Sequence, residues 1–168
     1  HDLTEQNEIH QRTGAQATLH LVEVEDARAY GCVPLDDDGR VQQFLEKMDN
    51  PIAKTINAGC YILTSNVVAA IKPGEVVSVE RETFPKLLES GARVTGFVDS
   101  QYWIDMGTPQ SFIRASRDLI LQPSLSPATS LNRSHKYPDA IVESGATVHE
   151  SAEIGGGTFI SSGAIIGA

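Results

Sequence analysis

Four short motifs place polar side chains beside glycines or at the ends of expected strands. They are Tyr30–Gly31, Glu46–Lys47, Asn57–Ala58–Gly59 and the stretch Trp103–Pro109. In an α/β protein the ligand crevice lies at the ends of the strands, next to the loops that follow them. We therefore treat these motifs as the candidate site and ask what chemistry their side chains could perform.

The side chains suit a ligand that carries hydroxyl and phosphate groups. Gly31 would let a ligand approach the backbone closely. Lys47 can hold a phosphate as a point charge, and Glu46 can accept hydrogen bonds from hydroxyl groups. The Asn57 amide can donate and accept. Asp105 precedes an expected helix start and offers the hard oxygen ligands that Mg²⁺ prefers.

Each motif also has an ordinary structural explanation. Gly31 and Gly59 could belong to turns at strand starts, and Glu46–Lys47 could be a solvated ion pair. Asp105 could simply form the turn before a helix capped by Thr108. No single motif decides the function, so the order of the motifs and their context along the chain carry the argument.

Composition excludes several classes of protein. The chain has 168 residues, 22 acidic against 13 basic side chains and a formal charge of -9, which disfavours nucleic-acid binding. No apolar run is long enough for a membrane span, and the N-terminal residues do not resemble a signal peptide. With only two cysteines, a cytoplasmic protein with reduced thiols is expected. The five histidines show no metal-ligand spacing.

Strands and helices are expected to alternate up to residue 121, as in an α/β layer. Asp2 and Glu5 have the form of a capping box before the first helix, and Pro85 should bend or split the third. The expected helices cover 3–12, 65–71, 78–90 and 109–121, with Ser65 and Thr108 as caps of the second and fourth. The expected strands cover 17–24, 56–63 and 92–98, with a hairpin of 31–35 and 40–44 around an Asp-Gly turn.

The composition and residue pattern of the sequence change at residue 122 and again at residue 140. Residues 122–139 are rich in proline and serine, which predicts a linker. From residue 140 aliphatic residues recur every six positions, each preceded two places earlier by a small residue, which is a hexapeptide repeat of the β-helix type. The aliphatic residues are Val142, Val148, Ile154, Ile160 and Ile166, and the small ones are Ala140, Ala146, Ala152, Thr158 and Ala164. Three hexads, or 18 residues, would complete one coil.

In this order, the motifs resemble the C-terminal half of the catalytic domain of sugar-1-phosphate nucleotidyltransferases. The mannose-1-phosphate guanylyltransferase-like branch, whose members carry a left-handed β-helix after a linker, is the most similar. The quoted motifs are Ala29–Val33, Asp38–Val41, Phe44–Lys47, Asn57–Tyr61, Phe84–Pro85 and Tyr102–Pro109. Met48 departs from the proline that often follows the glutamate-lysine pair.

The resemblance implies an architecture and a division of the chain. The fold would be a partial Rossmann-like α/β nucleotidyltransferase domain, its sugar-phosphate half, followed by a truncated left-handed β-helix. Residues 1–121 would be the half domain, 122–139 the linker and 140–168 the start of the β-helix. Self-association through residues 140–168 is expected, because an open β-helix end is a template for pairing.

The resemblance also assigns roles to the motif residues. Gly31 would contact the sugar through its backbone, and Glu46 and Asn57 would bind hydroxyls, with Gly59 in the same turn. Lys47 would hold the phosphate, and Asp105 would be one of two magnesium ligands. The other ligand and the glycine-rich nucleotide loop of the family would lie before residue 1, so the 168 residues alone are expected to be inactive.

The implied reaction converts a nucleoside triphosphate and a sugar 1-phosphate to an NDP-sugar and pyrophosphate. GTP with mannose 1-phosphate is the preferred pair, and a glucose 1-phosphate enzyme is close behind. Two alternatives stay open at this stage. One is a non-catalytic regulatory or scaffolding subunit of the same fold. The other is a hexapeptide-repeat acyltransferase, which would need a longer prism and a catalytic histidine, for which His149 is weak support.

Overall fold

The computed structural model describes residues 3–125, 133–134 and 136–168. Contacts divide the chain into two compact units, His1–Trp103 and Ile104–Ala168, and each is described by itself. The expected cap at Asp2 lies outside the described residues, as does part of the expected linker. Among the helices of the described part, none is long and apolar enough to cross a membrane.

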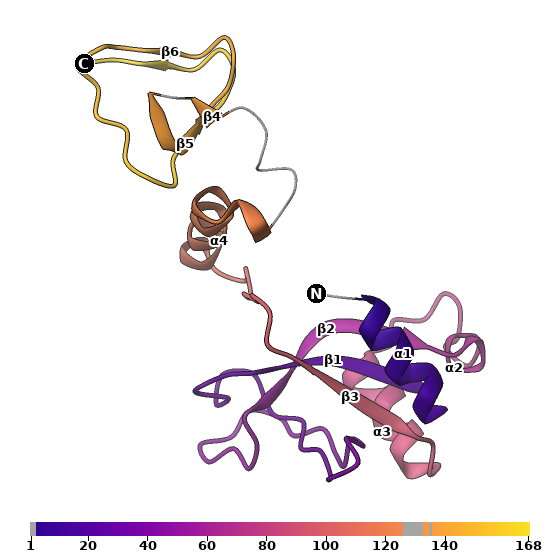
Figure 1. Cartoon of the computed structure of the whole chain (residues 1–168). Coiled ribbons are helices and arrows are strands. Elements are labelled where there is room, and N and C mark those ends of the chain that lie inside the picture. Colours follow the sequence, from indigo (N-terminus) through magenta and orange to yellow (C-terminus); the bar gives the residue numbers. More distant parts are fainter. Residues whose placement is uncertain (1–2, 126–132, 135) are drawn as a thin grey trace. The chain divides into compact units, whose positions relative to one another are not determined.

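A three-stranded mixed sheet forms the centre of the first unit (Figure 1). Strand β1 (Ala17–Glu23) lies in the middle, antiparallel to β2 (Thr55–Leu63) and parallel to β3 (Val94–Asp99). All residues of β1 except the last are buried. A sheet whose central strand is buried on both faces must be covered on both sides, and helices provide that cover.

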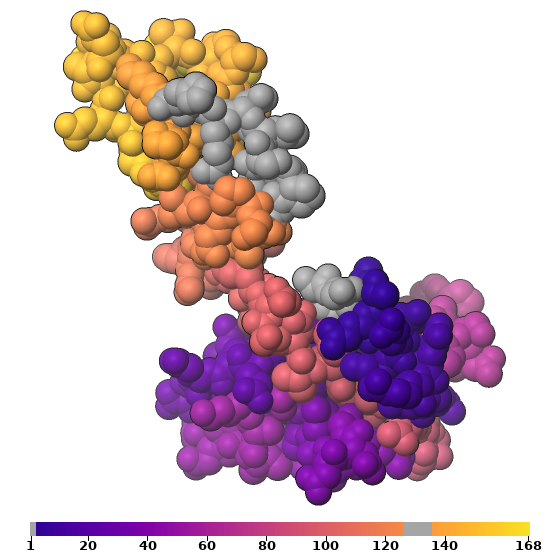
Figure 2. Space-filling model, in the orientation of Figure 1, coloured from indigo at the N-terminus to yellow at the C-terminus, as the bar shows by residue number. Residues whose placement is uncertain are grey.

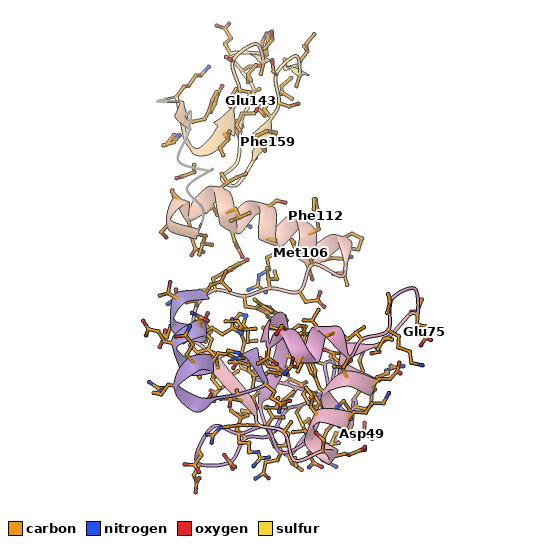
Figure 3. The ribbon with its side chains drawn as sticks, turned by 90° about the vertical axis from the view of Figure 1, so that its right-hand side faces the viewer. Asp49, Glu75, Met106, Phe112, Glu143 and Phe159 are labelled. Carbon is orange, nitrogen blue, oxygen red and sulfur yellow. The ribbon has the colours of Figure 1, made fainter. Side chains whose placement is uncertain are left out.

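Helices α1 (Leu3–Thr13) and α3 (Phe84–Glu89) cover opposite faces of this sheet, as Figures 1 and 3 show. On one face His10 of α1 reaches the Thr18 hydroxyl at 2.9 Å. The other face carries Leu19 and Leu21, which pack with Phe84 in one buried cluster. Successive strand residues point to opposite faces, so β1 contributes to both layers. Figure 2 shows the exposed side of α1 in indigo.

Phe84 anchors the main core. Its side chain is fully buried, and its ring stacks on Phe44 at 5.3 Å and meets Tyr61 edge-on at 5.0 Å between centroids. The remaining core cluster consists of apolar residues of β1, β3 and the segment between β1 and β2: Ala17, Leu19, Leu21, Val33, Val41 and Val94. The loop that carries Phe44 is therefore fixed to the sheet by aromatic packing.

The expected split at Pro85 is confirmed. A short π-helix, η1 (Val79–Thr83), precedes α3, and Pro85 stands in the first turn of α3, where its missing N–H costs nothing. Helix α2 (Ser65–Ala69) is shorter than expected, and Thr64 rather than Ser65 occupies its N-cap position, without a capping hydrogen bond from its side chain. The prediction erred by one residue because two hydroxyl residues stand side by side there.

The expected hairpin of 31–35 and 40–44 does not form two regular strands. Only isolated antiparallel bridges join Cys32 to Leu45 and Leu35 to Val41 in this described segment. Part of the backbone bonds elsewhere, since the Val41 N–H donates to the Val94 carbonyl of β3 and the Asp36 carboxylate accepts from two turn amides. Pairing with β3 therefore competes with hairpin pairing.

Helix α4 (Pro109–Leu121) opens the second unit and begins as expected. The Thr108 hydroxyl accepts the backbone N–H of Ser111 at 3.1 Å, and Pro109 occupies the first helical position. Phe112 projects from α4 and is exposed (Figure 3). The sequence division placed this helix in the first domain, whereas contacts group it with residues 104–168.

The expected linker is not irregular throughout its described part. A 3₁₀ turn, η2 (Pro123–Leu125), follows α4, and strand β4 (Arg133–Ser134) pairs antiparallel with β5 (Tyr137–Val142). Strand β5 thus begins three residues before the position where the hexads start. The sequence analysis did not predict this strand, because a composition rich in proline and serine indicates turns but does not show which segments between the turns pair as strands.

Residues 140–168, here called the hexad segment, form small parallel pairings. Strand β5 pairs with β7 (Phe159–Ile160), and β6 (Thr147–Val148) pairs with β8 (Ile165–Ile166). In both pairs the partners stand 18 positions apart. The aliphatic and small positions of the hexads are buried or half-buried, whereas most residues between them are exposed.

Candidate functional site

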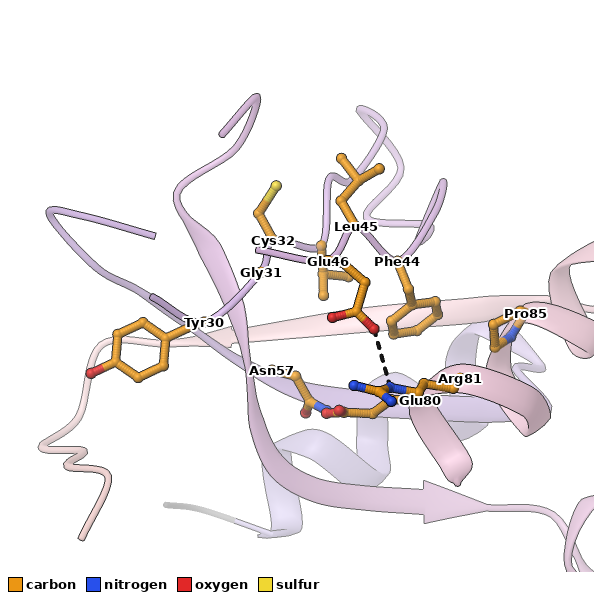
Figure 4. A pocket seen from close by; sticks show the side chains of 11 residues that line it. Tyr30, Gly31, Cys32, Phe44, Leu45, Glu46, Asn57, Glu80, Arg81 and Pro85 are labelled. Atoms are coloured by element: carbon orange, nitrogen blue, oxygen red, sulfur yellow. Dashed lines mark hydrogen bonds and ion pairs between the residues drawn. The ribbon is translucent and has the colours of Figure 1, made fainter. Parts of the chain in front are cut away.

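A pocket of about 390 Å³ lies in the first unit, beside the loops that follow β1 (Figure 4). Its walls come from the segment 30–33, the segment 44–46, strand β2 and the start of the η1–α3 helix pair. The lining residues are Tyr30, Gly31, Cys32, Val33, Phe44, Leu45, Glu46, Asn57, Glu80, Arg81 and Pro85. Three predicted site residues, Gly31, Glu46 and Asn57, are thus brought together.

Gly31 brings two pocket walls into contact. Its φ angle is +76°, and a Cβ atom built there would lie 2.4 Å from the Leu45 carbonyl oxygen. The neighbouring Cys32 and Leu45 exchange both backbone hydrogen bonds at 3.0 Å. Only glycine fits both the left-handed conformation and this close approach. Gly31 therefore fixes the distance between the segment that carries Tyr30 and the one that carries Glu46.

Asn57 forms a turn within strand β2. Its Oδ1 accepts the backbone N–H of Gly59 at 3.0 Å, and Gly59 adopts a φ of +84°. The register with β1 shifts at this point, so that the strand bulges. The Asn57 Nδ2 donates to the Tyr61 hydroxyl at 2.7 Å and to Glu80 Oε1. The amide therefore holds the Glu80 carboxylate against the pocket wall.

Tyr61 contacts both the Asn57 amide and the core residue Phe84. Burial raises the pKa of its phenol, and the hydrogen bond from Asn57 opposes part of that rise. The phenol thus stays protonated around neutral pH. Because its ring also packs on Phe84, Tyr61 links the Asn57 turn to the core of the unit.

An ion pair spans the pocket. Arg81 Nε lies 3.2 Å from Glu46 Oε1, as the dashed line in Figure 4 shows, and each side chain is about three-quarters exposed, at 75% and 74%. The backbone N–H of Arg81 donates to the Ser78 hydroxyl, which caps η1. Water screens a pair this exposed, so it contributes little to stability and is free to exchange partners.

Tyr30 and Trp103 form an aromatic contact at one side of the pocket. Their ring centroids are 6.0 Å apart in an edge-to-face arrangement. The Trp103 indole N–H donates to the Ala58 carbonyl at 3.3 Å, within the turn formed by Asn57. Trp103 therefore touches two of the four motifs identified in the sequence.

The other predicted residues lie outside the pocket lining. Lys47 follows Glu46 and is exposed, and Gly59 donates its backbone N–H within the Asn57 turn. Asp105 belongs to the second unit, where its Oδ1 accepts the Gly107 N–H at 3.0 Å. Within the described residues, no group of three or more His, Cys, Asp or Glu side chains could hold a metal ion.

Sequence reasoning missed Glu80 and Arg81. They stand between the Ser78 cap and Phe84–Pro85, within the first turn of an expected helix, where charged residues are common on solvated faces. Neither a glycine nor a distinctive spacing marks them. The only available signal was their proximity to the Phe84–Pro85 motif.

Comparison with known proteins assigns this arrangement to a family. The nucleotidyl transferase family matches residues 1–122, which include the whole pocket. The chain belongs to the nucleotidyl transferase family. Mannose-1-phosphate guanylyltransferase of Mycobacterium tuberculosis is 46% identical over 167 residues, which are 99% of this chain and 45% of that relative. Mannose-1-phosphate guanylyltransferase 1 of Arabidopsis thaliana is 32% identical over 98% of this chain and 45% of its own length.

Solved structures share the nucleotidyl transferase fold. HddC from Yersinia pseudotuberculosis is 28% identical with a TM-score of 0.54, over 67% of this chain and 48% of that one. A putative glucose-1-phosphate thymidylyltransferase from Bacillus anthracis, at 21% identity, has a TM-score of 0.58 over 81% of this chain and 52% of its own. This chain thus spans about half the length of these relatives and solved structures.

Proposed function

We propose that the intact protein containing this chain makes GDP-mannose and pyrophosphate from GTP and mannose 1-phosphate. The observation that carries the proposal is the pocket that gathers Gly31, Glu46 and Asn57, the residues expected to surround a sugar phosphate. The names of the relatives support the choice of substrates, since both are mannose-1-phosphate guanylyltransferases. A second HddC structure is described as complexed with GMP-PN, which supports a guanine nucleotide.

In the proposed reaction a phosphate oxygen of the sugar 1-phosphate attacks the α-phosphorus of GTP, and pyrophosphate leaves. Such a reaction depends mainly on positioning and on charge neutralisation. In this chain the Glu46 and Glu80 carboxylates would accept hydrogen bonds from sugar hydroxyls. Asn57, whose amide is engaged with Glu80 and Tyr61, would act chiefly by orienting Glu80.

Asp105 would provide one magnesium ligand. A carboxylate is the oxygen donor that Mg²⁺ takes, commonly with substrate phosphates as the other ligands. Asp105 fits this role with its Oδ2, since its Oδ1 accepts the Gly107 N–H. When bound, the ion would stabilise the negative charge that develops on the phosphates. Asp105 itself would only bind and orient it.

We further propose that the hexad segment is the start of a left-handed β-helix through which the protein self-associates. The parallel pairing of residues 18 positions apart and the inward-facing aliphatic positions support a coil of three hexads. Exposed Phe159, labelled in Figure 3, and Ile165 supply outward apolar surface for such contacts. A cytoplasmic location stays a prediction.

A direct assay tests the proposed function. The intact protein is incubated with GTP, mannose 1-phosphate and MgCl₂, and GDP-mannose and pyrophosphate are quantified. Glucose 1-phosphate in place of mannose 1-phosphate serves as the specificity control, and the 168-residue chain alone is expected to give no product. Equal turnover of both sugar phosphates would refute the choice of mannose, and no product with either would refute the activity.

A further inference from the structure

Buried polar side chains share one face of the central sheet. Thr18 and His20 of β1 and Thr95 and Asp99 of β3 are all buried. They stand at alternate positions of two neighbouring parallel strands, so they point to the same side, opposite the apolar cluster around Phe84. Burying a carboxylate is costly unless it is paired or hydrogen-bonded. The contacts of Asp99 therefore indicate what this carboxylate does.

Asp99 joins β1 to the segment that follows β3. Its Oδ2 lies 3.4 Å from His20 Nε2, and its Oδ1 accepts the backbone N–H of Gln101 at 2.8 Å. The His20 ring lies beside the ring of Phe97, at 6.1 Å between centroids. An aspartate that accepts the amide two residues further on closes a turn. Asp99 therefore sets the direction in which residues 100–103 leave the sheet.

Residues 100–103 end in Trp103, which contacts the surroundings of the pocket. Its indole N–H donates to the Ala58 carbonyl at 3.3 Å, and its ring meets that of Tyr30 edge-on at 6.0 Å between centroids. Trp103 also packs against the buried cluster that contains Cys32. Tyr30 and Cys32 both line the pocket. The place of the indole beside the pocket thus follows from a turn that begins four residues earlier.

We propose that Asp99 is a positioning residue for the pocket: together with His20 it holds the Trp103 indole in place beside it. The inference rests on the proposed function only for the identity of the sugar phosphate. Asp99 is not among the residues that line the pocket. It lines a separate hollow of about 360 Å³ at the C-terminal ends of β1 and β3, together with Trp103. An indole that is fixed before the ligand arrives lowers the ordering cost of binding.

The test uses variants of the intact protein. Asp99→Ala removes both contacts, whereas Asp99→Asn keeps an oxygen that accepts the Gln101 N–H. Trp103→Phe and the double variant Asp99→Ala/Trp103→Phe complete a cycle. The matched control is Asp36→Ala, since Asp36 also closes a turn by accepting backbone amides and lines neither hollow. Circular dichroism checks folding, and His20→Ala takes the place of Asp99→Ala if that variant does not fold.

Nuclear magnetic resonance observes the indole directly and without ligand. The Trp103 cross-peak in a ¹H–¹⁵N correlation spectrum is the indole signal that Trp103→Phe removes. In Asp99→Ala this cross-peak should move toward the position of a solvent-exposed indole, because the hydrogen bond to Ala58 weakens. Asp99→Asn and Asp36→Ala should leave it close to its wild-type position.

Steady-state kinetics measures the consequence for the pocket. Asp99→Ala is expected to raise KM for mannose 1-phosphate about 3- to 10-fold, as for the loss of one hydrogen bond, and to change KM for GTP less than about twofold. Asp99→Asn should restore most of the loss. In the Trp103→Phe background, Asp99→Ala should change KM for mannose 1-phosphate less than about twofold, because the effect passes through the indole.

Three results would overturn the inference. One is an Asp99→Ala cross-peak at the wild-type position, and another is an undiminished effect of Asp99→Ala in the Trp103→Phe background. The third is an equal rise of KM in Asp36→Ala, which would assign Asp99 to general stability. A wild-type protein that does not use mannose 1-phosphate would refute the proposed function, whereas the indole cross-peak would still decide whether Asp99 positions Trp103.

Discussion

The two compact units are stabilised by contacts of very different range. In the first unit one core joins residues distant in sequence, since Leu19 of β1 and Phe84 of α3 belong to the same buried cluster. In the hexad segment each pairing joins residues only 18 positions apart, such as Val142 and Ile160. A single shared core makes a unit fold as a whole, whereas stacked repeats are stabilised neighbour by neighbour. A core substitution in the first unit should therefore destabilise more of its surroundings than a core substitution in the hexad segment does.

The largest effect is expected from Phe84→Ala. This ring is fully buried and contacts both Phe44 and Tyr61, so its loss leaves a cavity worth about 3–5 kcal/mol of unfolding free energy. Urea unfolding followed by far-UV circular dichroism measures the change. Phe112→Ala is the matched control, since Phe112 is 60% exposed. Equal losses for the two variants would refute a single dominant core.

Ile160→Ala is the corresponding test in the hexad segment. Ile160 is 4% exposed and pairs with Val142, and truncating a buried isoleucine costs about 2–5 kcal/mol locally. Hydrogen exchange should speed up in residues 140–168 while the amides of β1 keep their protection. Ile165→Ala, at a position 81% exposed, should change little. Loss of protection in β1 as well would show that the two units unfold together.

Substitutions in the two units should also separate catalysis from affinity. In the intact protein, Asp105→Asn is expected to lower kcat by about a hundredfold or more, because the proposed magnesium ligand would act on charge that develops during the reaction. Glu46→Gln should chiefly raise KM for the sugar phosphate, by roughly tenfold. Steady-state kinetics with varied Mg²⁺ distinguishes them. Unchanged turnover and magnesium dependence in a folded Asp105→Asn protein would reduce Asp105 to a turn former.

Two glycines of the first unit differ in what a side chain would meet. Both have positive φ angles, but only at Gly31 would a Cβ strike backbone, the Leu45 carbonyl at 2.4 Å. Gly59→Ala should therefore cost about 1 kcal/mol of conformational strain, and Gly31→Ala about 2–3 kcal/mol. Thermal unfolding and mannose 1-phosphate binding are measured on both. A smaller penalty at Gly31 than at Gly59 would contradict the close approach.

The smallest effect concerns pH. Desolvation lowers the pKa of His20, although the Asp99 carboxylate, 3.4 Å away, opposes the shift. Between the folded pKa and the unfolded value near 6.5, the unfolded chain binds more protons, so stability of the first unit falls as pH drops below about 6.5. His10 shifts in the same direction. The test compares the urea unfolding midpoints of two proteins, His10→Asn and the double variant His10→Asn/His20→Asn, each at pH 7.5 and 5.5. An equal pH dependence in both would contradict it.

Local sequence signals predicted the regular elements well. Thr108 followed by Pro109 located the start of α4, and Pro85 located the split between η1 and α3, because caps and prolines act through their own backbone. The segment 31–44 was harder, since its backbone bonds partly to β3, some fifty residues further on. Pairing at such range leaves no local trace.

The candidate site was only partly predicted, because contacts between distant segments leave no local signal in the sequence. Gly31, Glu46 and Asn57 stand in motifs that resemble a known family, and the pocket gathers them. Lys47 was expected beside Glu46 at the site; it is exposed and is not among the lining residues of the pocket. Arg81 was missed because its place in the pocket depends on the packing of Phe84, three residues further on, which charge patterns do not reveal.

Trp103 is a natural fluorescence reporter beside the pocket. It is the only tryptophan of the chain, its indole donates to the Ala58 carbonyl, and it touches the ring of the pocket residue Tyr30. Indole emission depends on the polarity and hydrogen bonding around the ring. A ligand that moves Tyr30 or the Asn57 turn would therefore change the fluorescence of a single, known reporter. Ligand occupancy of the pocket would then be followed in real time without a label.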